Sequence, residues 1–261
     1  MAILECNMFS NCIGRTITFN AVIPVGKNRM FERVDDEVKP FKTLYLLHGI
    51  LNNHMTYLTR SRIQELAEEH NLAVIMPSGE YSFYVDNPNG CNFGQFIGEE
   101  LIEETRKMFN LSKRREDTFI GGLSMGGYGA LRNGFKYNKV FSKIGAMSSA
   151  AILWDIINTT DHSIIPPVGR GFYENIFGNL DKLDGSDKDL KALVLNLKEK
   201  KEIIPEIFMA CGTEDFLLEN NRKFVNFLKK EGIEFIYNES AGGHEWVFWN
   251  EYLEKIIKWL L

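Results

Sequence analysis

The sequence predicts an α/β fold, in which helices cover both faces of a mostly parallel β-sheet. Short β-branched or apolar runs alternate along the chain with longer segments of helical period, and this alternation is typical of such a fold. A chain of 261 residues with 44% hydrophobic content can bury a large core and lies within the range of one α/β domain. We therefore expect a single domain over residues 1–261.

Local patterns predict the individual elements. Apolar, β-branched runs predict strands over residues 15–23, 43–47, 72–76, 118–121, 141–147, 206–210 and 234–237. Helical periodicity predicts helices near residues 56–70, 94–109, 125–137, 219–231 and 244–260. In the last of these segments the apolar residues recur on one stripe, which indicates a helix docked on the sheet.

One long interval interrupts the alternation. The stretch between the strands expected at 141–147 and 206–210 contains Pro166, Pro167 and a charged run, and it is too long for a plain connection. We interpret residues from about 150 to about 205 as an inserted, cap-like and partly helical segment. Either Ser186 or Asp187 is expected to cap a helix over residues 189–198.

Composition and charge exclude several classes of protein. The chain carries 30 Lys and Arg against 35 Asp and Glu, and neither sign forms a long block, which argues against nucleic-acid and membrane-surface partners. No apolar stretch could span a bilayer, and the N-terminal residues lack the pattern of a secretory signal, so we expect a cytoplasmic protein. The four cysteines form no C-x-x-C pair and have no histidine at zinc-finger spacing, so we expect no metal and no cofactor.

A G-x-S-x-G pattern at residues 122–126 places Ser124 directly after a predicted strand and directly before a predicted helix. The bare pattern arises by chance in a glycine-rich chain, but a strand, a sharp turn and a helix around it are far rarer. Such a turn exposes the serine hydroxyl, and small neighbours let strand and helix approach each other. The alternative is a turn that only packs a helix on the sheet. The context favours a nucleophilic serine and the α/β-hydrolase fold.

A nucleophilic serine needs a histidine base and a carboxylate that orients the histidine, and in this fold they follow in the order Ser, Asp or Glu, His. A turn after one predicted strand carries Glu214 and Asp215, and a Gly-Gly loop after the next strand carries His244. Both segments follow the carboxyl ends of strands, so we expect them at the same edge of the sheet as Ser124. The residues alone leave Glu214 and Asp215 open as the acid.

The same chemistry needs two backbone N–H groups to hold an oxyanion. One belongs to Met125, which follows the nucleophile, and we assign the other to Ile50, in the loop after the strand at 43–47. His48 lies in that loop, and we expect it to form local hydrogen bonds that shape the loop without transferring a proton.

With these residues placed, the chain resembles the esterase D-like family of α/β-hydrolases, which includes bacterial tributyrin esterases, S-formylglutathione hydrolases, feruloyl and acetylxylan esterases and mycolyltransferases. The matching pieces are LYLLHGI, LAVIMPSGEYSFYVD, FIGGLSMGGYGALRNG, IFGN with GSDKDLKAL, CGTEDFLLENN and GGHEWVFW. The resemblance implies that Ser124, Asp215 and His244 form the triad and that Ile50 and Met125 form the oxyanion hole. It also implies a protein that is often oligomeric and acts on short-chain acyl esters.

We therefore predict a serine carboxylesterase that hydrolyses short-chain acyl esters, acetyl or butyryl, of small-molecule or carbohydrate alcohols, sugar- or feruloyl-linked esters among them. Two alternatives remain: an acyltransferase or thioesterase such as S-formylglutathione hydrolase, and an inactive binding protein of the same fold. Tyr84, Trp154 and Trp246 are candidates for substrate contact, although core packing would explain these aromatic residues equally well.

Overall fold

The computed structural model describes residues 1–26, 39–87, 90–159 and 169–261. Their strands form one eight-stranded sheet in the order β1-β2-β4-β3-β5-β6-β7-β8. The pairs β1/β2 and β2/β4 are antiparallel, and every later pair is parallel. The predicted mostly parallel sheet is therefore confirmed. The strands are β1 Ala2–Ser10, β2 Arg15–Ile23, β3 Lys42–Leu47, β4 Leu72–Pro77, β5 Thr118–Leu123, β6 Lys143–Met147, β7 Glu206–Gly212 and β8 Ile236–Ser240.

Strand β1 is the one strand of the described residues that the sequence analysis did not predict. It lies at the edge of the sheet, where it pairs only with β2. Its side chains alternate between half-buried and exposed, and apolar residues occur on both faces. Because neither face is fully buried, the sequence lacks the strong alternation that marks a strand.

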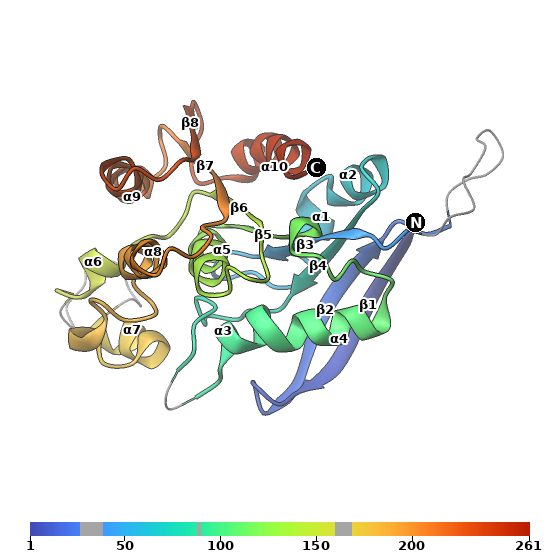
Figure 1. Ribbon diagram of the computed structural model, residues 1–261, viewed down its shortest axis with the longest axis horizontal. Coiled ribbons are helices and arrows are strands. Elements are labelled where there is room, and N and C mark those ends of the chain that lie inside the picture. Colours follow the sequence, from blue (N-terminus) through green and yellow to red (C-terminus); the bar gives the residue numbers. More distant parts are fainter. Residues whose placement is uncertain (27–38, 88–89, 160–168) are drawn as a thin grey trace.

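Helices cover both faces of the sheet (Figure 1). They are α1 Thr56–Arg60, α2 Ile63–Glu69, α3 Phe93–Gln95, α4 Leu101–Met108, α5 Met125–Lys136, α6 Leu153–Ile156, α7 Arg170–Phe177, α8 Leu190–Glu199, α9 Leu218–Lys230 and α10 Trp246–Leu260. Side chains from α4, α5 and α9 form one core with the sheet, and side chains from α1, α2 and α10 form a second core on the opposite face. In β3, Leu44 and Leu46 point to the second core, while Tyr45 and Leu47 point to the first.

The helix expected over residues 56–70 is broken into α1 and α2. Ser61 between them is extended, with φ −133° and ψ 171°. Its hydroxyl donates to the carbonyl of Tyr57 at 2.6 Å and accepts from the N–H of Ile63 at 3.2 Å. A serine side chain that competes for backbone partners in this way ends one helix and starts the next. The segment expected over 94–109 is likewise composite, because a π-helical turn at Phe96–Glu100 joins α3 to α4.

The chain between β6 and β7 contains α6, α7 and α8. Part of the segment expected from about 150 to about 205, residues 160–168, lies outside the described residues. The expected N-cap of α8 was wrong: Asp189 caps the helix, and its carboxylate accepts from the N–H of Lys191 at 2.9 Å. Asp187 is not available for capping because its carboxylate pairs with Arg132 and Lys136 of α5, at 2.5 Å each.

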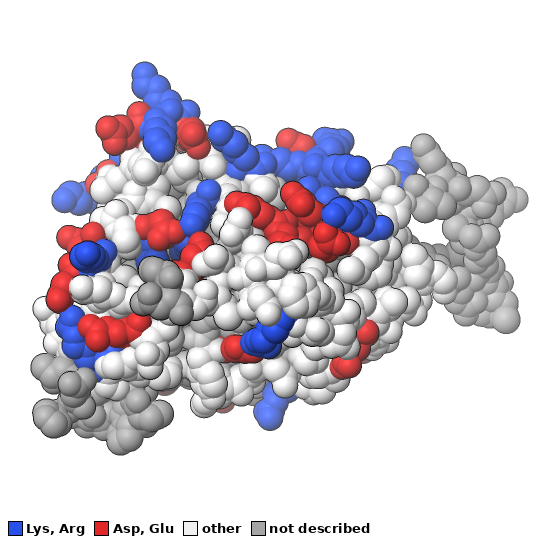
Figure 2. Space-filling view, turned by 90° about the horizontal axis from the view of Figure 1, so that it is seen from below, with Lys and Arg blue, Asp and Glu red and all other residues white. Residues whose placement is uncertain are grey.

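On the face shown in Figure 2, basic and acidic side chains lie next to one another, and no broad basic area covers it. In the described part of the chain, no helix is both long and apolar enough to cross a membrane.

Candidate active site

Ser124 sits in a sharp turn between β5 and α5. Its backbone has φ 56° and ψ −119°, a strained conformation for a residue with a side chain. The glycines on either side are required by close contacts: a Cβ on Gly122 would collide with the backbone of Gly126, and one on Gly126 would collide with the carbonyl of Leu47. The strand, turn and helix expected around this serine are therefore present.

The structure brings Ser124 and His244 together at the carboxyl edge of the sheet. The Nε2 atom of His244 lies 3.0 Å from the Oγ of Ser124. The Nδ1 atom lies 2.9 Å from Oδ2 and 3.1 Å from Oδ1 of Asp215. Residues separated by as many as 120 positions in the chain thus form one continuous hydrogen-bonded series. The imidazole bridges a hydroxyl and a carboxylate, which is the arrangement that a serine nucleophile needs.

The carboxylate of Asp215 is fully buried and well supplied with donors. Burial raises the pKa of this group, but hydrogen bonds from His244, Ser148 and the N–H of Leu217 lower it, and the pKa ends below its usual value. The side chain therefore stays ionised at neutral pH. An ionised carboxylate can hold the histidine ring in one tautomer and stabilise it when the ring becomes protonated.

Glu214, the other carboxylate of the same turn, has a different set of partners. Its side chain is exposed and accepts from the N–H of Gly242 at 2.5 Å, while its own N–H donates to the carbonyl of Gly242 at 3.0 Å. These two bonds fasten the loop that carries His244 to the end of β7. The geometry thus assigns Asp215 to the histidine ring and Glu214 to the loop backbone.

The two expected oxyanion donors lie close to Ser124. Met125 is next to it in the chain, and Ile50 belongs to a loop that packs against it. Met125 is the first residue of α5, where backbone N–H groups have no acceptor within the helix. Ile50 lies in the loop after β3, and this loop lies against the nucleophile, because a Cβ on Gly49 would be 3.3 Å from the Cβ of Ser124. The positive end of α5 adds a favourable field for a negative charge beside Ser124.

The side chain of His48 holds the same loop by hydrogen bonds. Its Nε2 accepts from the N–H of Gly79 at 2.8 Å, so Nδ1 carries the proton and donates to the carbonyl of Gly49 at 2.7 Å. Burial lowers the pKa of His48 to about 4, and the ring is neutral. The expected local role of His48 agrees with these contacts.

Two aromatic rings contact His244, and the sequence analysis did not predict either contact. The ring of Phe216 lies 4.5 Å from the imidazole, and the ring of Trp249 lies 4.8 Å from it at 87°. Trp249 also donates from Nε1 to the Oγ of Ser148 at 3.0 Å, and Ser148 in turn hydrogen-bonds to Asp215. The sequence places Phe216 directly after the acid and Trp249 on the apolar stripe of α10, and neither position by itself indicates a contact with His244.

The three candidates for substrate contact have different surroundings. Tyr84 was wrong as a candidate for substrate contact: it is fully buried, and its hydroxyl donates to the carbonyl of His48 at 2.9 Å. Trp246 is half-buried and packs edge-on against Tyr57 at 5.5 Å and Trp249 at 5.4 Å, one layer away from His244. Trp154 lies on α6, with the ammonium of Lys191 4.4 Å from its ring.

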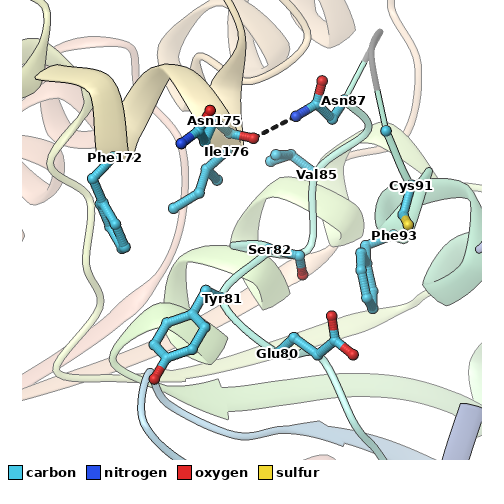
Figure 3. Close-up of a pocket in the computed structure, with 11 residues that line it drawn as sticks. Glu80, Tyr81, Ser82, Val85, Asn87, Cys91, Phe93, Phe172, Asn175 and Ile176 are labelled. Atoms are coloured by element: carbon cyan, nitrogen blue, oxygen red, sulfur yellow. Dashed lines mark hydrogen bonds between the residues drawn. The ribbon is translucent and has the colours of Figure 1, made fainter.

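A cavity of about 480 Å³ lies between the loop after β4 and helix α7 (Figure 3). Tyr81 and Phe172 both line it and pack edge-on against each other, with their ring centroids 6.4 Å apart. Neither Ser124, Asp215 nor His244 lines this cavity, so it is not the place where a bond could be attacked by the serine. Among the described residues, no cluster of three His, Cys, Asp or Glu side chains is arranged to hold a metal ion.

The sequence model of the family described as "Putative esterase" matches residues 10–260. The chain belongs to this esterase family. A protein named acetyl esterase from Caldicellulosiruptor saccharolyticus is 48% identical over 262 residues, which cover 100% of this chain and 98% of that protein. The chain is a carboxylic ester hydrolase, and the predicted family and enzyme class are confirmed.

Solved structures of related proteins share the fold over nearly the whole chain. A fluorophosphonate-binding serine hydrolase from Staphylococcus aureus is 29% identical, with a TM-score of 0.87 over 99% of this esterase and 98% of that chain. An S-formylglutathione hydrolase from the same organism is 30% identical, with a TM-score of 0.84 and the same coverage. A ferulic acid esterase at 22% identity and a TM-score of 0.74 covers 99% of this chain and 97% of its own, and shows the fold alone.

Proposed function

We propose that this esterase removes acetyl and other short acyl groups from ester substrates through an acyl-enzyme formed on Ser124. The single observation that carries the proposal is the continuous hydrogen-bonded series from Ser124 through His244 to Asp215. The preference for a short acyl group is supported by the similarity to a protein named acetyl esterase. The alcohol part of the ester, whether simple, sugar-linked or feruloyl-linked, is left open by both observations.

In the first step, His244 takes the proton of the Ser124 hydroxyl while the oxygen attacks the ester carbonyl carbon. The carbonyl oxygen becomes an oxyanion, and we assign its two hydrogen bonds to the N–H groups of Ile50 and Met125. Asp215 stabilises the imidazolium that forms. Each oxyanion donor of this kind contributes roughly 2.7 to 4 kcal/mol to stabilising the transition state.

In the second step, the imidazolium gives its proton to the oxygen of the leaving alcohol, and the acyl group remains on Ser124. Water then attacks the acyl carbon and gives a proton to His244. The new oxyanion collapses, the carboxylic acid is released, and the imidazolium returns its proton to the Oγ of Ser124. The side chains of the proposed triad thus return to their starting protonation states after each turnover.

A second candidate function keeps the chemistry and changes the substrate or the acceptor. The similarity to an S-formylglutathione hydrolase supports thioester hydrolysis, and an alcohol in place of water would make the protein an acyltransferase. Rates with nitrophenyl acetate and with S-formylglutathione, each with and without an added alcohol acceptor, would rank these activities. We expect the oxygen ester to be the better substrate and water to be the main acceptor.

The test of the nucleophile is Ser124→Ala, which removes the attacking oxygen and leaves the fold unchanged. We expect its rate of nitrophenyl acetate hydrolysis to fall by at least about 10³-fold. A retained wild-type rate would refute the assignment of Ser124. An inactive binding protein, the other alternative, would show no turnover in the wild type either.

We also propose a cytoplasmic location, which is supported by the free thiols of all four cysteines. Oligomerisation remains a prediction from the resemblance, and light scattering on the purified protein would measure the subunit number.

A further inference from the structure

The most exposed large apolar side chains of the described residues gather around the active site. Leu51 is 81% exposed, Val247 79% and Phe216 74%, and the next in order, Phe9, is 62% exposed. Leu51 directly follows the oxyanion residue Ile50, Phe216 directly follows Asp215, and Val247 lies three residues after His244. Apolar exposure that is concentrated beside a catalytic site is a mark of binding surfaces.

Neither Leu51 nor Phe216 is explained by the stability of the free protein. Leu51 has φ 65°, a left-handed conformation that is unfavourable for a leucine, and its side chain buries little surface in return. The ring of Phe216 leaves most of its apolar surface in water, although a polar residue at that position would be better solvated. Apolar side chains that gain little in the free protein are best explained by contacts with a bound molecule.

Phe216 lies beside the histidine that gives a proton to the leaving group. In the proposed reaction the alcohol oxygen receives its proton from Nε2 of His244, so this oxygen must come within hydrogen-bond distance of that atom. The ring of Phe216 lies 4.5 Å from the imidazole ring, tilted by 46°. Because the ring lies this close to the side chain that protonates the leaving oxygen, a substituent on that oxygen can reach it.

We propose that Phe216 is a specificity-determining residue that contacts the alcohol part of the ester and favours larger alkyl and arylmethyl alcohols over methanol. The inference rests on the proposed function and adds the class of leaving group to it. The contact removes apolar surface of both the ring and the substituent from water, and an aromatic substituent can also pack edge-on against the ring. The acyl part is not involved, because it stays on Ser124 after the alcohol has left.

The test compares acetate esters that differ only in their alcohol. Methyl acetate and benzyl acetate give the same acetyl-enzyme, so a difference between them arises before or during release of the alcohol. For Phe216→Ala we expect kcat/KM for benzyl acetate to fall about five- to tenfold, mainly through a higher KM, and kcat/KM for methyl acetate to stay within about twofold of the wild type. Phe216→Leu keeps an apolar contact and should restore part of the loss.

Phe9→Ala is the matched control, because Phe9 is an exposed phenylalanine on the edge strand β1. It should leave both esters unchanged. An equal loss with methyl and benzyl acetate in Phe216→Ala would overturn the proposal and make Phe216 a positioning residue for His244, and no loss with either ester would overturn it as well. Hydrolysis that survives in Ser124→Ala would instead refute the proposed function, so the two failures can be distinguished.

Discussion

At the scale of single residues, the most specific result is that the adjacent carboxylates of Glu214 and Asp215 have different partners. Asp215 contacts the imidazole, while Glu214 holds the backbone of Gly242. We expect Asp215→Asn to lower kcat for nitrophenyl acetate about 10³- to 10⁴-fold, because an amide no longer stabilises the imidazolium. Glu214→Gln, which keeps an oxygen that can accept from Gly242, should cost less than about tenfold. The reverse ranking of the two variants would reassign the acid.

The buried ring of His48 predicts a measurable pH dependence of stability. Its pKa is about 4 in the folded protein, below the ordinary value of 6.5 that applies to the unfolded chain. Between these two values only the unfolded state binds the proton, so the free energy of unfolding should fall as the pH decreases from about 6.5 to about 4, by up to about 1.4 kcal/mol per pH unit. Urea unfolding of the wild type and of His48→Gln measures this.

Other groups titrate equally in both proteins, so the difference between the two curves isolates His48. The wild type should lose stability more steeply than His48→Gln on acidification through this range. Parallel curves from pH 7 to pH 4 would show that His48 does not titrate as its burial predicts.

At the scale of elements, the close approach of α5 to β3 depends on Gly126. A Cβ at this position would collide with the carbonyl of Leu47, which is part of the sheet and cannot move freely. Gly126→Ala should therefore destabilise the protein by about 1–3 kcal/mol, measured by urea unfolding. Gly171 in α7 is the matched control, because a Cβ there meets nothing within 4 Å. Gly171→Ala should be neutral or slightly stabilising, and an equal loss in both variants would contradict the steric argument.

A group of charges ties α5 to two other segments. Arg132 is fully buried and pairs with Asp86, in the loop after β4, at 3.3 Å and with Asp187, before α8, at 2.5 Å. Partial burial raises the pKa of Asp187, but Arg132 and Lys136 lower it below its usual 3.8. The stabilisation is therefore complete above about pH 5 and is lost as the pH falls through the lowered pKa, below 3.8. The loss of stability in Asp187→Asn should be constant from pH 7 to 5 and shrink below pH 4; a loss that is constant down to pH 3 would contradict this.

The sheet and most helices could be predicted because buried parallel strands and amphipathic helices leave strong local patterns. Strand β1 could not, because an edge strand with apolar residues on both faces has no clear period. The break at Ser61 and the cap at Asp189 depend on which polar side chain forms a hydrogen bond with the helix backbone. Several serine and aspartate residues that could form such a bond lie next to each other in the sequence. Asp187 does not cap the helix because its carboxylate pairs with Arg132, which lies 55 residues earlier in the chain.

At the scale of the whole molecule, the fold brings three loops to one edge of the sheet, and the site follows from that convergence. Ser124, and His244 as its base, could be predicted because motif and chain order constrain them, whereas the choice of Asp215 needed the family resemblance. Phe216, Trp249 and Ser148 could not be predicted as neighbours of the site, since their contacts depend on how loops from β6, β7 and β8 meet. Tyr84 shows the converse: an aromatic candidate for substrate contact is buried, with its hydroxyl bonded to the carbonyl of His48.

The central claim is that an acyl group passes through the oxygen of Ser124. The most direct measurement is mass spectrometry of the enzyme quenched in acid during turnover of nitrophenyl acetate. We predict a mass increase of one acetyl group, located on the peptide that contains Ser124 and absent from Ser124→Ala. Acetyl found on another residue, or turnover by the wild type with no acetyl on Ser124 at any time after mixing, would contradict the account.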